Sequence, residues 1–208
     1  MTNVLIVDSA ATGEASVTRR LTAELESALR GRGPVRIVHR DVGTHPVPHL
    51  TAETTPAIRG AEAESEAARE SIALSDALIA ELKAADLVVI GAPMYNFGIA
   101  STLKAWFDHV LRAGITFRYS EAGPEGLLKG RKAIVIESRA GLYSSGPSAP
   151  MDSQEPHLRT LLGFRGFDDV EFVRGEKLAF GPDQAAASIE EAIDRLRGLA
   201  AQDLPLAA

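Results

Sequence analysis

The sequence predicts an α/β protein in which a five-stranded parallel sheet carries helices on both faces. Short apolar runs alternate along the chain with longer amphipathic stretches, which is the pattern of repeated βα units. The short runs are continuously apolar, as expected for strands that are buried on both sides of a sheet. We expect the strand order 2-1-3-4-5, which is taken from doubly wound folds of this size and does not follow from periodicity.

The first half of the chain supplies three of the strands. Residues 4–7, 35–38 and 87–90 are short apolar runs typical of strands. Residues 16–29 and 66–84 repeat apolar side chains at helical spacing, so each predicts an amphipathic helix that packs on the sheet.

The second half continues the same rhythm after one interruption. Residues 101–111 predict a helix with Ser101 as its N-cap. Residues 116–130 alternate and contain a Gly-Pro pair, which indicates a small hairpin or flap. The remaining expected elements are strands at 133–136 and 170–173 and helices at 157–167 and 183–199.

Length and composition favour one ordinary domain covering residues 1–208. A chain of 208 residues buries about 70% of its unfolded surface, and no Pro- or Ser-rich linker divides it. The net charge of -6 argues against nucleic acid as a partner. The longest mostly apolar run, residues 87–100, is shorter than the roughly 20 residues of a membrane helix. The first residues resemble a strand and not a signal peptide, so we expect a soluble cytoplasmic protein.

The sequence does not predict a metal site. Cysteine is absent, which excludes thiolate ligands and disulfides. No pair of histidines has helical ligand spacing with a nearby carboxylate. The histidines considered are His39, His45, His49, His109 and His157.

The loop after the first strand has the chemistry of a phosphate site. Ser9, Ser16 and Thr18 offer hydroxyl groups, and the loop leads into a helix whose free N–H groups favour an anion. Arg19 and Arg20 follow and add positive charge. The loop contains neither a Walker sequence nor a Gly-x-Gly-x-x-Gly fingerprint. The structural alternative is that Ser16 only caps the helix.

The loop after the third strand is suited to a planar ring. Its aromatic and thioether side chains can line a ring system, and we expect Asn96 to be a buried amide that needs partners. The alternative is ordinary core packing. The residues are Pro93, Met94, Tyr95, Asn96 and Phe97.

The loop after the fourth strand contains small residues that allow close approach of the backbone to a ligand. Its N–H groups are expected to face the electron-rich edge of a ring, although a plain turn explains the sequence equally well. In the order 2-1-3-4-5 the three loops lie side by side at the carboxyl edge of the sheet. The residues are Ser138, Arg139, Ala140 and Gly141.

With these motifs, the chain resembles the bacterial FMN-dependent NADH-azoreductases, flavodoxin-like relatives of DT-diaphorase-type quinone reductases. The most specific parts are Ala-Pro-Met-Tyr-Asn-Phe at 92–97, Phe-Arg-Tyr at 117–119, Ser-Arg-Ala-Gly at 138–141 and Leu-Gly-Phe at 162–164. The resemblance implies tightly bound FMN, NADH or NADPH as electron donor, and a quinone or azo acceptor that follows it in a ping-pong reaction. It also implies a homodimer.

By position, the resemblance implies a role for each loop. The FMN phosphate would be held by Ser9, Ser16, Val17 and Thr18. Residues 93–97 would hold the ring and the ribityl chain, and residues 138–141 would meet the pyrimidine side of the ring. The substrate pocket would be bordered, across a dimer interface, by Tyr119, Tyr143 and Phe164.

The chain departs from the family pattern at three positions that bear mainly on substrate choice. Val17 stands where the family often has Gln, Ala140 where a second Gly is common, and Tyr143 where some members carry His. No side chain is assigned as a catalytic acid, and solvent is the expected proton source. The rival functions are an FMN-bearing electron carrier or flavin sensor and, with less support, a hydrolase that uses Ser9.

Overall fold

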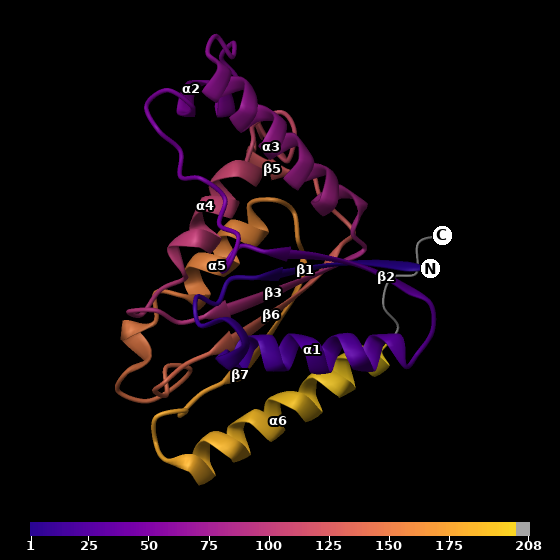
Figure 1. The fold of residues 1–208 in the computed structure, drawn as a ribbon, viewed down its shortest axis with the longest axis vertical. Helices are drawn as coiled ribbons and strands as arrows, with labels where there is room; N and C mark the ends of the chain where they lie inside the picture. The colour runs from indigo at the N-terminus through magenta and orange to yellow at the C-terminus, as the bar shows by residue number, and fades with distance from the viewer. Residues whose placement is uncertain (203–208) are drawn as a thin grey trace.

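The computed structural model describes residues 1–202, and it shows a five-stranded parallel sheet between two layers of helices (Figure 1). The strand order is β2-β1-β3-β6-β7. Leaving out the two hairpin strands, this is the order 2-1-3-4-5, so the predicted fold and topology are confirmed. The strands are β1 (Thr2–Asp8), β2 (Val35–Asp41), β3 (Leu87–Pro93), β6 (Lys132–Ser138) and β7 (Asp169–Gly175).

Each face of the sheet has its own apolar core. Helices α1 (Val17–Arg30) and α6 (Pro182–Ala201) cover one face, and α3 (Glu66–Ala84), α4 (Ser101–Val110) and α5 (Glu155–Gly163) cover the other (Figure 1). Successive side chains of β3 point to opposite faces: Leu87 and Val89 belong to the first core, Val88 and Ile90 to the second. This double burial explains why the strands appear as continuous apolar runs.

Two helices differ from the prediction at their first residues, and α5 also ends at Gly163, before the predicted end at residue 167. Helix α4 is capped by Ala100, so Ser101 is its first residue and the predicted N-cap is wrong. Helix α5 begins at Glu155, two residues before the predicted start, because proline is well accommodated in a first helical turn and residue 156 is Pro. The Asp152 carboxylate also accepts from the N–H groups of Gln154 and Glu155, at 2.8 and 3.1 Å.

Three short elements were not predicted. They are the four-residue helix α2 (Thr55–Ile58) and the 3-10 turns η1 (Gly13–Ala15) and η2 (Ala149–Met151). Each is too short to produce a recognisable apolar period in the sequence.

A hairpin lies within the predicted segment 116–130. Its strands are β4 (Phe117–Ser120) and β5 (Gly123–Gly126), paired antiparallel. The Leu128 N–H donates to the Arg165 carbonyl at 2.9 Å, which ties the hairpin to the end of α5. The Phe117 ring lies 4.6 Å from that of Phe164.

Arg165 lies under this hairpin as a buried cation. Its guanidinium stands 4.4 Å from the Phe107 ring and 5.3 Å from the Trp106 ring, and it forms no ion pair with any described carboxylate. Burial lowers the pKa of Arg165 to about 9, so it is still charged at neutral pH. The two aromatic faces and the Leu161 carbonyl, which accepts from Arg165 Nε at 3.3 Å, interact with this charge.

Among residues 1–202, the helices are all too short or too polar to cross a bilayer.

Candidate functional site

The loops at the carboxyl edge of the sheet are joined by direct hydrogen bonds. The Ala11 N–H donates to the Tyr95 hydroxyl at 3.0 Å, which links the first loop to the second. The Met94 N–H donates to the Ser138 carbonyl at 2.9 Å, which links the second to the third. The predicted convergence of the three loops is therefore confirmed.

A cleft of about 280 Å³ lies between these loops. Eight residues singled out from the sequence line it: Ser16, Val17, Pro93, Met94, Tyr95, Ser138, Arg139 and Ala140. Four lining residues were missed: Thr12, Ala15, Leu178 and Ala179. The last two follow β7, whose carboxyl end lies at the same edge, so the strand order alone was enough to include that loop.

The start of α1 forms the polar end of the cleft. Ser16 caps the helix by accepting from the Arg19 N–H at 3.4 Å, and its hydroxyl lies 2.8 Å from that of Thr18. The structural reading of Ser16 is thus correct, and it is compatible with ligand binding. The N–H groups of Val17 and Thr18 are in the first turn, where a helix leaves its donors free for an anion.

The arginines near this turn do not supply charge to the cleft. Arg19 Nη2 donates to both carboxylate oxygens of Asp41 at 2.6 and 2.7 Å, and Arg20 pairs with Glu190 at 3.3 Å. The expectation that they add charge at the phosphate turn is therefore wrong, because distant carboxylates bind both. The helix end itself is the anion-attracting group.

Ser9 is buried behind the cleft. Its hydroxyl donates to the Gly91 carbonyl at 2.7 Å and its N–H donates to the same oxygen at 3.2 Å. Among the described residues, no imidazole contacts that hydroxyl, which disfavours a hydrolase nucleophile. A role of Ser9 toward a phosphate stays a prediction.

The second loop is a tight turn with a strained aromatic residue. Tyr95 and Gly98 exchange backbone hydrogen bonds at 3.0 and 3.1 Å, and φ is +47° at Asn96 and +71° at Phe97. These angles define a type I′ turn, which suits Asn and is unfavourable for Phe. Asn96 is exposed, so the expectation of a buried amide is wrong: the turn projects it outward.

The third loop keeps its N–H groups available. The carbonyls of Arg139, Ala140 and Gly141 accept from the segment after β7 at 3.3, 3.0 and 2.9 Å. The N–H groups of Ala140 and Gly141 bond to no other described residue. They are the donors that the sequence assigned to the edge of a ring. The Tyr143 ring covers Gly141, where a Cβ atom would lie 3.0 Å from it.

Arg139 lines the cleft only through its backbone. Its side chain is completely buried and bonds to carboxylates behind the loop, so its guanidinium is not available to a ligand in the cleft. Like Ser9, seven other predicted site residues do not line the cleft: Thr18, Asn96, Phe97, Tyr119, Gly141, Tyr143 and Phe164.

Two carboxyl groups close to the strand ends are held toward their neutral form. Burial raises the pKa of Glu137 to about 7 despite its ion pair with Arg139. Burial also raises the pKa of Asp8, and the nearby Arg19 and the Thr22 hydroxyl counteract it only in part. Neither residue lines the cleft, so we assign neither a catalytic role.

A larger groove of about 740 Å³ runs between β7 and α6. Its arginines are already paired, Arg174 with Glu155 at 2.7 Å and Arg195 with Glu171 at 3.0 Å. The first turn of α6 borders it, but Pro182 has no N–H group and Asp183 places a carboxylate there, which disfavours an anion. The free donors therefore make the smaller cleft the better candidate site for a phosphate-bearing ligand.

Comparison with known proteins identifies the family. Residues 2–199 match the model of a family described by its flavodoxin-like fold. An FMN-dependent NADH:quinone oxidoreductase of Hyphomonas neptunium is 54% identical over 192 residues, 91% of each chain. This chain belongs to that oxidoreductase family. A protein of the same name from Azotobacter vinelandii is 46% identical over 202 residues, 96% of this chain and 100% of its own.

The solved structures that resemble this member of the FMN-dependent NADH:quinone oxidoreductase family include azoreductases. That of Bacillus anthracis strain Sterne has a TM-score of 0.88 and 27% identity, and the match covers 96% of this chain and 99% of its own. The resemblance stated from sequence motifs is thereby confirmed.

The cleft fits the FMN after which the oxidoreductase family is named. It offers free N–H groups and hydroxyls at the start of α1 for a phosphate. It offers an apolar wall of Pro93 and Met94 for a ring and the free Ala140 N–H for a polar ring edge. The free Gly141 N–H follows on the same loop, just outside the lining. Within residues 1–202, no group of three or more histidine and carboxylate side chains is arranged to hold a metal ion.

Proposed function

We propose that this protein binds FMN in the cleft and carries two electrons from NADH to quinones and azo compounds. The strongest support is that unused backbone donors occur on two of the loops that line one cleft, at the first turn of α1 and at Ala140. Bound FMN supplies the redox chemistry by accepting a hydride and releasing two electrons. NADPH is the alternative donor.

The protein's own contribution is position and electrostatics. The N–H groups of Val17 and Thr18 and the Ser16 hydroxyl bind the phosphate. Pro93, Met94 and Tyr95 hold the ring in place and exclude water from one side of it. The N–H groups of Ala140 and Gly141 stabilise negative charge that develops on the ring edge beside them. Solvent supplies the protons that the acceptor requires.

A cytoplasmic homodimer is the proposed working form. Tyr119 is 74% exposed on the hairpin and stacks edge-on with Phe117 at 5.5 Å, next to Phe164. An aromatic side chain so exposed is well placed to contact a second copy. In such a dimer Tyr119 and Phe164 would border the substrate space of the partner copy.

An electron carrier is the second candidate function. It differs from the proposed enzyme in the components that an activity assay needs. A carrier needs a partner protein, whereas the proposed enzyme oxidises NADH with a soluble quinone alone. The Phe97 and Tyr143 rings meet edge to face with their centroids 6.1 Å apart, so the loops that line the cleft also carry an aromatic pair beside it, which favours a small-molecule substrate. Steady-state NADH oxidation by a quinone, without other proteins, separates the two.

The cofactor is tested by colour. The purified protein is expected to be yellow, to release FMN on denaturation and to bleach when NADH is added under argon. Absorption spectra and chromatography of the released pigment provide the measurement. A colourless protein that FMN cannot reconstitute would contradict the proposed function.

Replacing Tyr119 by alanine tests the shared pocket. We expect kcat/KM for the quinone to fall about tenfold while FMN content is unchanged, because an aromatic contact to the substrate is lost. Arg118→Gln on the same strand is the control, since within residues 1–202 the one carboxylate that pairs with Arg118 is that of Glu125, at 2.7 Å. Light scattering measures the molar mass of the protein in solution. A fully active monomer would refute the proposed dimer.

A further inference from the structure

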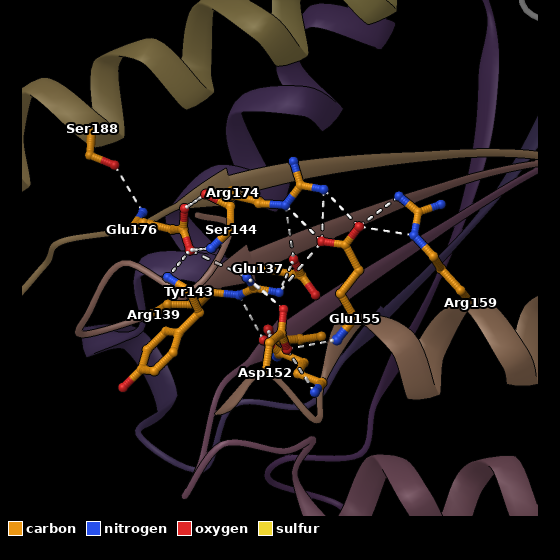
Figure 2. A network of polar contacts seen from close by, with 12 residues as sticks. Glu137, Arg139, Tyr143, Ser144, Asp152, Glu155, Arg159, Arg174, Glu176 and Ser188 are labelled. Atoms are coloured by element: carbon orange, nitrogen blue, oxygen red, sulfur yellow. Dashed lines mark hydrogen bonds and ion pairs between the residues drawn. The ribbon is translucent and has the colours of Figure 1, made fainter. Parts of the chain in front are cut away.

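A single buried guanidinium lies behind the third loop of the cleft. Arg139 is fully buried and lies within ion-pair distance of four carboxylates (Figure 2). The distances are 2.6 Å to Glu137, 3.1 Å to Asp152, 3.3 Å to Glu176 and 3.7 Å to Glu155. These partners come from β6, from the segment before α5, from α5 and from the end of β7. Four separate parts of the chain therefore meet at one side chain.

One branch of this network leads to the third loop. Arg139 Nη1 donates to Glu176 Oε1 at 3.3 Å. The same oxygen accepts from the N–H groups of Tyr143 and Ser144 at 2.8 and 3.0 Å (Figure 2). Burial opposes ionisation of Glu176, yet these donors, the Ser144 hydroxyl and Arg139 together lower its pKa. The charged carboxylate therefore fixes the far end of the loop that carries Ala140 and Gly141.

A second branch leads to the second loop. Arg139 Nε donates to Gln154 Oε1 at 3.0 Å, and Gln154 Nε2 donates to the Ala92 carbonyl at 2.8 Å. Ala92 is the residue before Pro93, where the loop that lines the cleft begins. Next to Gln154, the Ser153 N–H donates to the Phe97 carbonyl at 3.0 Å. The two walls of the cleft are thus connected through Arg139.

The planar fork of arginine is required for this arrangement. Nε, Nη1 and Nη2 each bond in a different direction, to Gln154, Glu176 and Glu137. A buried ion network of this kind is poor evidence for stability, because desolvation offsets most of the attraction. A role in geometry accounts better for so many acidic groups gathered about one cation.

We propose that Arg139 is a positioning residue that sets the separation and orientation of the two loops between which the flavin ring binds. Its side chain acts through Glu176 on the 138–144 loop and through Gln154 on the 93–97 loop, and the guanidinium does not itself touch the cofactor. This role rests on the proposed function, since it assumes that FMN occupies the cleft.

Arg139→Lys is the first test, because lysine keeps the charge and loses the fork. Buried acceptors on Gln154, Glu176 and Glu137 lose donors, so the variant should melt at a lower temperature than wild type. At temperatures where it is folded, we expect it to bind FMN about 10- to 100-fold more weakly, as misplaced binding groups do. At saturating FMN, the absorption bands of the bound flavin should shift and kcat should fall. Arg159→Gln is the matched control: it removes a cation from the exposed rim of the same network, where Arg159 pairs with Glu155 at 2.6 Å.

Gln154→Met provides a second variant if Arg139→Lys fails to fold. It changes no charge and breaks only the connection between Arg139 and Ala92, so the same weaker FMN binding and shifted spectrum are expected. FMN titration by fluorescence quenching measures both variants. If Arg139→Lys folds and has the wild-type FMN affinity and absorption spectrum, the positioning role is overturned. If Arg139→Lys does not fold, the same result in Gln154→Met overturns it.

Hydrogen exchange of the protein stripped of FMN separates the two hypotheses. The amides of Tyr143 and Ser144 should exchange faster in Arg139→Lys than in Arg159→Gln. In Gln154→Met, used as its substitute, the faster exchange should fall on the Met94 amide, which joins the second loop to Ser138. If the wild-type protein fails to bind FMN, the proposed function is wrong. The rates of amide hydrogen exchange then test by themselves whether Arg139 positions the two loops. Equal exchange in all variants would overturn the positioning role whatever FMN does.

Discussion

Replacing Gly126 by alanine is expected to lower the free energy of unfolding by more than about 3 kcal/mol. A Cβ atom at this position would overlap the backbone nitrogen of Gly166 and the carbonyl group of Arg165. Both obstacles are backbone atoms, so no side-chain rotation relieves the overlap. The hairpin must therefore separate from the end of α5, and the buried Arg165 beneath it becomes accessible to water.

The matched control is Gly163→Ala, only three residues from Gly166. A Cβ atom at Gly163 meets no atom within 4 Å, and this residue ends helix α5. Alanine is favoured over glycine in a helix, so this variant should be unchanged or slightly more stable, by up to about 1 kcal/mol. Urea unfolding of both variants measures the difference. Equal stabilities for Gly126→Ala and wild type would show that the hairpin tolerates displacement.

Gly126→Ala is also expected to affect activity. The hairpin carries Tyr119, so its displacement should lower turnover of the quinone, while the cleft that we assign to FMN is built from other loops. A folded Gly126→Ala variant is therefore expected to retain FMN and to lose activity.

The sheet and the meeting of its loops were predictable because they follow from local patterns and from one rule of topology. Five apolar runs separated by amphipathic helices leave few alternatives, and the carboxyl ends of neighbouring parallel strands necessarily meet. Ser16 was recognisable as a cap because the capping hydrogen bond spans only three residues.

The parts that were not predictable depend on contacts between distant segments. The sequence assigns Arg139 to a loop that meets the ligand. That its side chain points away from the cleft is evident only from its ion pairs with Asp152 and Glu176, which are distant in the sequence. The sequence also does not show that Asp41 neutralises Arg19, 22 positions earlier. Asn96 was misplaced because adjacency to a buried strand does not determine which way a turn projects its side chains.

Replacing Glu137 by glutamine is expected to change how stability depends on pH. Burial raises the pKa of this carboxyl to about 7, and one of its oxygens lacks any described partner. Between pH 4.5, the ordinary value, and about 7, the unfolded chain releases the proton while the folded protein keeps it. Wild-type stability therefore falls as pH rises through this window.

The size of the effect follows from the same shift. A rise from 4.5 to about 7 corresponds to about 3 kcal/mol at roughly 1.36 kcal/mol per pH unit. Glutamine does not titrate, so the stability of Glu137→Gln relative to wild type should increase by up to about 3 kcal/mol between pH 5 and pH 8. Glutamine also keeps an oxygen that can accept from Arg139 Nη2, which bonds Glu137 at 2.6 Å.

Urea unfolding of both proteins at several pH values between 5 and 8 measures this difference. Asp41→Asn is the control. Burial opposes ionisation of Asp41, but the bond from Arg19 and those from Thr44 lower its pKa to about 2, so the contribution of Asp41 is lost only in more acidic solution. Its difference from wild type should therefore be constant over this range. A difference between Glu137→Gln and wild type that is equally constant would mean that Glu137 is ionised throughout, with Arg139 compensating fully for its burial.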